Sequence, residues 1–121
     1  MKENIVKDKS YKFAIRIVKL SKYLQDSMRE YVLSNQILRS GTAIGALIRE
    51  SEHAESKADF IHKMSIALKE ANETQYWIDL LKDTGFIDEN AYQSIKPNVN
   101  ELISLLVSII KTAKHNKRME R

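Results

Sequence analysis

Carboxylates and histidines at helical spacing are the first residues in this chain that could do chemistry. Glu50 and His53 lie three positions apart, as do Asp59 and His62, which is the spacing by which di-iron helical bundles bind metal. Such a centre needs two Glu-x-x-His motifs and two further glutamates that point into the middle of a bundle. Both pairs here flank one predicted loop at an end of the bundle, and His115 lies in a basic tail. We therefore predict no metal site and no cofactor, and we assign these side chains to surface ion pairing.

Other catalytic arrangements have less support in the sequence. The chain has no cysteine, which excludes a thiolate nucleophile, a disulfide and a cysteine-ligated zinc site. It has no Gly-rich phosphate loop and no plausible Ser-His-Asp set. Trp77, Tyr76 and Tyr92 could stack on bases, but a lone tryptophan on a long helix more often packs. We predict no catalytic residues and no enzymatic activity.

Positive charge is concentrated at the two ends of the sequence. The net charge is +4, yet residues 1–22 contain seven Lys or Arg and two acids, and residues 111–121 contain five Lys or Arg and one acid. Residues 23–110 are acidic in balance. The chain is an acidic body with two basic ends, a pattern that matters more than the total charge.

The elements that must position these residues are helices. Apolar residues recur at spacings of three and four along most of the chain, which is typical of amphipathic helices. Three glycines and one proline are too few for the turns of an all-β fold. The pattern predicts four helices, over residues 10–31, 36–54, 57–82 and 88–115.

Capping residues support these boundaries. Ser34 or Asn35 could cap the second helix, Ser56 the third and Asp88 the fourth, while Gly85 ends the third helix. The first helix is expected to place Phe13, Ile17, Leu20, Leu24 and Met28 on one apolar face. Pro97 predicts either a kink in the last helix or a break after a short first segment.

Length and composition fit one soluble domain. The 121 residues, 43% hydrophobic and 30% charged, allow one core and predict a single domain over residues 1–121. The amino terminus is charged and has no signal-peptide pattern, and no apolar run is long enough to span a bilayer. We expect a cytoplasmic protein with no membrane partner. Short connections make sequential helices antiparallel neighbours, so the predicted fold is an all-α, up-down-up-down antiparallel four-helix bundle.

This topology brings the two basic ends to the same end of the bundle. A concentrated cationic pole is typical of proteins that bind phosphate backbones, although lysine-rich termini can also be solvated tails. The expected pole comprises Lys2, Lys7, Lys9, Lys12, Arg16, Lys111, Lys114, Lys117, Arg118 and Arg121, opposite Asp83, Asp88 and Glu89. Within the basic ends of the chain, the predicted nucleic-acid contacts are Lys9, Lys12, Arg16, Lys19, Lys111, Lys114 and Lys117.

Small residues in the second helix form another unusual feature. Gly41 and Gly45 lie one turn apart, and each costs about 1 kcal/mol relative to alanine in a helix. A smooth face of this kind allows another helix to approach closely, either in the same bundle or in a neighbouring subunit. Arg39 lies beside this face and could pair with Glu50, Glu70 or Glu73, a structural use that fixes register.

The second and third helices carry residues that resemble a known family. The run from Gln36 to Gly45, with Arg39, Ser40 and Gly41, is similar to the Gln-x-x-Arg-Ser/Ala signature of four-helix proteins encoded in intervening sequences of bacterial 23S ribosomal RNA genes. The stretch from Ala58 through Ile66 to Leu81 and Gly85 resembles the second half of the same family.

The resemblance implies a small bundle that assembles as a ring, with a homopentamer as the expected state. Related proteins include accessory subunits of diversity-generating retroelements, which bind nucleic acid and a reverse transcriptase. Arg39, Glu50 and Glu73 fall on positions where the family commonly carries Arg, Glu and Glu. With Gln36, Gly41 and Gly45, they are interpreted as structural or interface residues.

Two functional hypotheses follow. The first is a non-enzymatic, oligomeric protein that binds nucleic acid, with structured RNA favoured over DNA, through the basic pole. The second is a protein–protein adaptor or scaffold ring for a larger enzyme such as a reverse transcriptase, without nucleic-acid specificity of its own.

Overall fold

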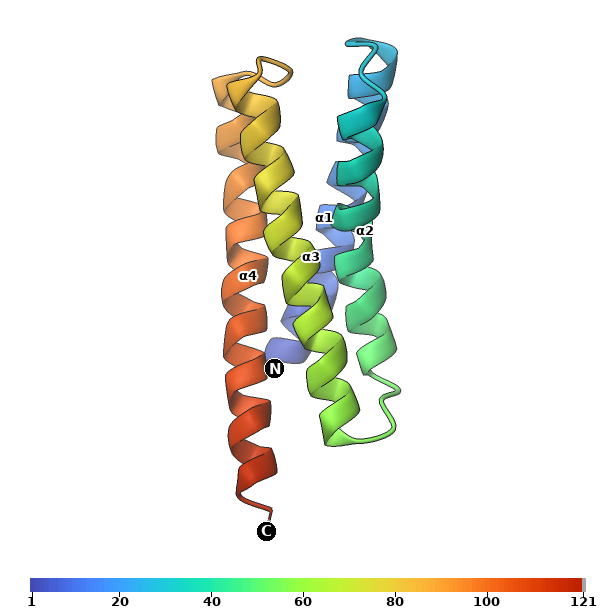
Figure 1. Ribbon diagram of the computed structural model, residues 1–121. Helices are drawn as coiled ribbons and strands as arrows, with labels where there is room; N and C mark the ends of the chain where they lie inside the picture. Colours follow the sequence, from blue (N-terminus) through green and yellow to red (C-terminus); the bar gives the residue numbers. More distant parts are fainter. Residues whose placement is uncertain (121) are drawn as a thin grey trace.

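Four long helices make up the molecule. The computed structural model describes residues 1–120 (Figure 1). Each helix packs against the next one in the chain, and the last helix closes back onto the first. The predicted all-α, up-down-up-down antiparallel bundle is therefore confirmed. The helices are α1 (Lys2–Asp26), α2 (Val32–Ser51), α3 (Lys57–Asp83) and α4 (Glu89–Arg118).

An apolar face of every helix is buried in one continuous core. Removing such a side chain from water contributes about 1.5–3 kcal/mol, so the core holds the four helices in register. No helix in the described residues combines the length and apolar character needed to cross a bilayer. The largest fully buried apolar side chains are Ile17, Leu24, Ile37, Ile44, Met64, Ile78, Leu81, Leu102 and Leu106.

The predicted caps of α3 and α4 are present. The Ser56 hydroxyl accepts a hydrogen bond from the Asp59 N–H at 3.0 Å, and the Asp88 carboxylate accepts one from the Ala91 N–H at 2.8 Å. Gly85 has φ of +83°, and the Phe86 N–H that follows it donates to the carbonyl of Leu81 at 2.9 Å. This left-handed turn after α3 needs a glycine.

The boundaries of α1 differ from those predicted. The helix begins at Lys2 instead of residue 10, and Val6 in its second turn is fully buried. It ends at Asp26, because the chain reverses through Arg29, which takes a left-handed φ of +51°. Met28 therefore lies outside the helix and is exposed, so its predicted place on the apolar face is wrong.

The boundaries of α2 also move. The helix begins at Val32, and neither Ser34 nor Asn35 is its cap. The Ser34 N–H instead donates to the carboxylate of Glu30, which precedes the helix, at 2.8 Å. At the other end the helix stops at Ser51, before the predicted residue 54.

Helix α4 runs through Pro97 without a break, to Arg118. Proline lacks the N–H that would bind the carbonyl of Gln93. Both Gln93 and Pro97 are exposed, so water can reach that carbonyl. The predicted alternative of a short first segment is wrong for this reason.

Candidate nucleic-acid interface

A line of cations runs along one face of α1. Because α1 starts at Lys2, five basic residues on it recur at steps of seven, three, four and three, a spacing that keeps them on one face of a helix. From Lys2 to Lys19 the helix rises by 17 residue steps, about 25 Å. We call this set the α1 basic stripe; its members are Lys2, Lys9, Lys12, Arg16 and Lys19.

The stripe lies beside α4, and several of its members contact that helix. Lys2 donates to the Ser108 hydroxyl, and the Lys9 ammonium lies 3.2 Å from the Glu101 carboxylate. Lys12 pairs instead with Asp8 of its own helix, at 3.0 Å. These pairs are exposed, so each adds at most about 1 kcal/mol and is weakened by salt.

Arg16 and Lys19, like Lys2, have no carboxylate partner within residues 1–120, and they are neighbours on α1. The Arg16 guanidinium donates to the Ser94 carbonyl at 2.9 Å, to the Ser94 hydroxyl at 2.7 Å and to the Asn98 side-chain oxygen. All three acceptors are neutral. The half of the stripe that lies towards the end of α1 therefore keeps its positive charge.

The predicted cationic pole does not form as a single cluster. Lys2 lies at the end of the bundle that holds both termini, whereas Arg16 borders, with Lys19, the groove beside the α3–α4 loop that also contains Asp88 of the predicted acidic pole. Distance along α1 explains the separation, since its cations follow the helix away from the termini. Lys7 is also neutralised, by Glu52 at 3.0 Å. Arg121 lies outside the described residues.

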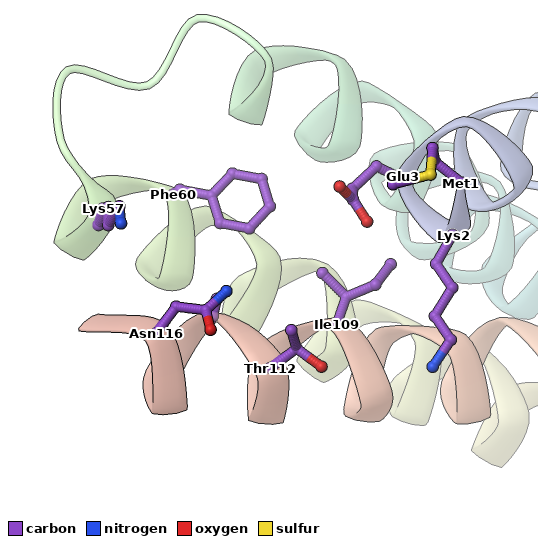
Figure 2. A pocket seen from close by; sticks show the side chains of 9 residues that line it. Met1, Lys2, Glu3, Lys57, Phe60, Ile109, Thr112 and Asn116 are labelled. Carbon is purple, nitrogen blue, oxygen red and sulfur yellow. The ribbon is translucent and has the colours of Figure 1, made fainter. Parts of the chain in front are cut away.

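The end of the bundle that holds the termini has an apolar hollow at its surface. Figure 2 shows this cavity of about 580 Å³ between the first turns of α1 and α3 and the last turns of α4. Phe60 and Ile109 line it together with Met1, and Lys2 and Lys57 are the cations at its edge. Lys111, Lys114 and Lys117 do not line it.

The three lysines near the end of α4 are exposed but do not form a line. Residues three apart on an α-helix drift by about 60° per step, so Lys111, Lys114 and Lys117 wind around α4. Lys117 lies in the last turn, where a positive charge is favourable for the helix dipole. They form a second basic surface, distinct from the α1 basic stripe.

The two glycines of α2 face α1 of the same chain. A Cβ at Gly41 would lie 2.8 Å from two side-chain carbons of Ile17, and one at Gly45 would lie 3.3 Å from the Ser10 hydroxyl. Of the two predicted alternatives, close approach within the same bundle is therefore supported directly by the packing of these glycines. Ser10 is itself buried and donates to the carbonyl of Lys7 at 3.0 Å.

Arg39 forms the expected carboxylate contacts across α2 and α3. Its guanidinium lies 3.2 Å from a Glu70 carboxylate oxygen and also donates to Glu73. The Trp77 indole N–H donates to the same Glu73 oxygen at 3.2 Å. Burial alone would lower the pKa of Arg39, but the charges of Glu70 and Glu73 outweigh it and raise that pKa. Arg39 is half exposed. The network therefore fixes the register of α2 against α3 more than it adds to the free energy of unfolding.

The remaining predicted residues have no shared site. Gln36 and Glu50 are both exposed, and Glu50 is not part of the Arg39 network. In the part of the chain that the structure describes, no three His, Asp or Glu side chains come together in a way that could hold a metal ion. The Glu50–His53 and Asp59–His62 spacings therefore find no further ligands there.

One polar cluster was not predicted. The Tyr92 hydroxyl donates to Asp79 at 2.8 Å, while the Lys82 and Lys96 ammonium groups lie 4.9 and 5.1 Å from the centre of its ring. Lys96 also pairs with Asp79. Tyr92 therefore helps to hold α4 against α3. The sequence signal that could have predicted this cluster is the spacing of Tyr92 and Lys96, which are one helical turn apart.

Fold and surface together define a small four-helix bundle with a line of basic residues along α1. The chain belongs to the 23S rRNA-intervening sequence protein family, whose model matches residues 2–108. It is similar to a crystal structure of a protein of unknown function from the S23 ribosomal protein family of Bacteroides thetaiotaomicron. The two share 58% identity with a TM-score of 0.90, over 92% of this chain and 99% of that one. No curated protein matches.

Proposed function

We propose that this protein is a non-enzymatic nucleic-acid-binding protein whose α1 basic stripe contacts the phosphate backbone, with structured RNA as the favoured ligand. The observation that carries the proposal is the line of five cations along about 25 Å of one helix. A line of positive charge suits a polyanion, because each phosphate contact releases counterions and adds affinity.

The half of the stripe that lies towards the end of α1, with Arg16 and Lys19, is expected to contribute most to phosphate binding. Arg16 is held in place by three neutral acceptors, so its charge is both fixed and available. Lys9 and Lys12 have exposed carboxylate partners that a phosphate could replace at small cost. The lysines near the end of α4 form a second basic surface, in which they are not aligned along one face of the helix.

The experiment is fluorescence anisotropy of a labelled RNA hairpin, repeated over a series of salt concentrations. We expect affinity to fall steeply with salt, and the double variant Lys12→Glu/Lys19→Glu to bind at least about tenfold more weakly, with the salt slope reduced by about two. Lys22→Glu/Lys69→Glu is the matched control, since it changes the net charge equally at exposed positions outside the stripe. Equal affinities for the two variants would exclude the stripe as the binding surface.

A second variant separates the two basic surfaces. Lys111→Glu/Lys114→Glu leaves the α1 basic stripe intact, and it should weaken binding less than the Lys12→Glu/Lys19→Glu variant does. If it weakens binding more, the last turns of α4 are the main contact. Absence of RNA and DNA binding at low salt for the unmodified protein would refute the nucleic-acid proposal altogether.

An adaptor function is the second candidate, and an exposed apolar line on α1 favours it. Tyr11, Ile15 and Val18 follow a four-three spacing and are 53%, 41% and 40% exposed, so they form a face that a protein could cover. The proposed assembly is a homo-oligomer, with a pentamer as the state to test, that scaffolds a larger enzyme such as a reverse transcriptase. Sedimentation velocity of the protein and of Ile15→Glu tests it: a stable monomer in both cases would contradict the ring.

A further inference from the structure

A groove lies at the end of the bundle that carries the α1–α2 and α3–α4 loops. The two helical hairpins diverge towards this end (Figure 1), and the groove between them has a volume of about 810 Å³. Its walls come from the last turns of α1, the α1–α2 and α3–α4 loops and the first turns of α4. The apolar side chains that line it are Leu20, Tyr23, Met28, Phe86, Ile87, Ala91 and Ile95.

One edge of this groove is cationic. Arg16 and Lys19 both line it, and within residues 1–120 neither forms an ion pair with a carboxylate. The groove also contains one carboxylate, Asp88, but it caps α4 through the Ala91 N–H. Asp88 lies six residues before Ser94, where Arg16 is bound, or about 9 Å along the helix. Arg16 is therefore remote from this carboxylate, and Lys19 does not form an ion pair with it.

The shape of the groove favours a helix over a small molecule. Small-molecule sites are concave and bury most of their ligand, whereas this groove is open along its length and has exposed Tyr23 and Met28 in its wall. From Arg16 to Tyr23 it follows α1 for seven residues, about 10 Å. That length accommodates two turns of a helix laid into it, with apolar residues at every third or fourth position inserted.

We propose that this groove binds an amphipathic helix of a partner protein, with its apolar face inserted and an acidic flank against Arg16 and Lys19. Charge complementarity at that edge sets the orientation of the helix and selects acidic over basic segments. The groove shares Arg16 and Lys19 with the α1 basic stripe, but its apolar lining is not part of the proposed phosphate contacts, and the proposal does not depend on RNA binding.

The test uses two labelled peptides of about 18 residues, long enough to form a helix. Both carry Leu and Phe along one face, and one has Glu and the other Lys on the flanks. Fluorescence anisotropy with the full chain should show the Glu peptide binding at least about tenfold more tightly than the Lys peptide. Lys19→Glu should reduce that preference, whereas Lys22→Glu, at an exposed position that does not line the groove, should leave it unchanged.

A filled groove gives the steric control. Ala91 is exposed and lines the groove, and only its backbone N–H takes part in the cap, so Ala91→Trp should block the peptide without unfolding the bundle. Asn90→Trp, next to it but outside the groove, should bind normally. Ala91→Trp should leave RNA binding unchanged, which separates this proposal from the nucleic-acid one.

Three outcomes would overturn the proposal. The first is equal binding of the Glu and Lys peptides, or no binding of either. The second is binding of the fluorescent anion anilinonaphthalene sulfonate in a manner sensitive to Ala91→Trp while the peptide does not bind, which would make the groove a small-molecule site. The third is a change in the oligomeric state of Ala91→Trp, which would assign the groove to contacts between copies of this chain.

Discussion

Helix α1 has two neighbours, and it meets them in different ways. Against α2 it packs closely: Ile17 fills the space that a Cβ at Gly41 would occupy, and Ser10 faces Gly45. Against α4 it packs least closely of all the neighbouring pairs, and the contacts there are long polar side chains such as Arg16 and Lys9. We call the α1–α2 contact the tight joint and the α1–α4 contact the open seam.

The difference separates stability from recognition. Small residues allow α1 and α2 to approach, and the core side chains behind them then exclude water. Along the seam with α4, charged side chains stay partly solvated and an apolar groove remains unfilled at one end. A surface with accessible charge and unfilled apolar area is where a ligand gains most by binding. We therefore propose that the α1–α2 contact contributes mainly to stability and the α1–α4 seam to recognition.

The largest expected effect comes from breaking the tight joint. Gly41→Leu adds a side chain where even a Cβ would lie 2.8 Å from Ile17, so α1 must move away from α2. Overpacking of this kind costs about 3 kcal/mol or more in the free energy of unfolding. Urea denaturation followed by circular dichroism measures the loss.

A second change tests whether Ile17 is the cause. Combining Gly41→Ala with Ile17→Ala removes the side-chain carbons that the new Cβ would meet. The cost of the double variant should then be less than the sum of the two single costs. Simple additivity would show that α1 and α2 can separate freely and that the joint is not tight.

The next largest effect is expected from a substitution that weakens the open seam between α1 and α4. Arg16→Met keeps the aliphatic stem but removes the hydrogen bonds to Ser94 and Asn98, which should cost about 1–2 kcal/mol. Amide hydrogen exchange should become faster in residues 89–98 and stay unchanged in α2 and α3. Lys12→Met is the control, since Lys12 pairs only within α1. Uniformly faster exchange in all four helices would show that the seam is not an independent region.

The sequence predicts the fold because local signals and the global pattern agree. Ser56, Asp88 and Gly85 mark the limits of α3 and α4 by side-chain and backbone chemistry that can be recognised in a sequence. The end of α1 has no such signal, since a non-glycine residue, Arg29, takes the left-handed conformation there. The start of α2 is held by Glu30, two residues before the helix, whose side chain accepts from the Ser34 N–H; this local contact differs from the usual N-cap pattern that pointed to Ser34 or Asn35.

The candidate site was harder to predict than the fold. The basic residues could be listed from the sequence, but their arrangement depended on where α1 begins. A start at residue 10 leaves Lys2 and Lys9 in a tail, whereas the observed start at Lys2 aligns them with Arg16 on one helical face. The groove was not predictable at all, because it arises from how far two hairpins diverge, which no local pattern encodes.

A smaller effect concerns how α4 is held to α3 on the side away from the seam. Burial alone would raise the pKa of Asp79, but hydrogen bonds from Lys96 and Tyr92 lower it below its ordinary value of 3.8. Because the pKa is lower in the folded state, this contribution to stability is present above about pH 4 and is lost as the pH falls through the folded value. Asp79→Asn should cost about 1 kcal/mol or less at pH 7, since the carboxylate is partly exposed. Urea midpoints of the two proteins should converge below pH 4; a gap that persists at acid pH would mean that packing, and not charge, is lost.

The smallest effect is expected at Gly45, and it tests how far the close packing of α1 against α2 extends along the tight joint. Gly45 lies on the same face of α2 as Gly41, yet a Cβ there would lie 3.3 Å from the Ser10 hydroxyl and 3.5 Å from the Ser10 carbonyl oxygen, close but not overlapping. Gly45→Ala gains about 1 kcal/mol of helix propensity, and the slight displacement of Ser10 offsets most of it. We expect the free energy of unfolding to change by about 0.5 kcal/mol or less, in contrast to the large loss for Gly41→Leu. A loss at Gly45 as large as that at Gly41 would mean that the backbone of α1 cannot yield anywhere along the joint, and the tight contact would then extend from Ile17 to Ser10 without a gradient.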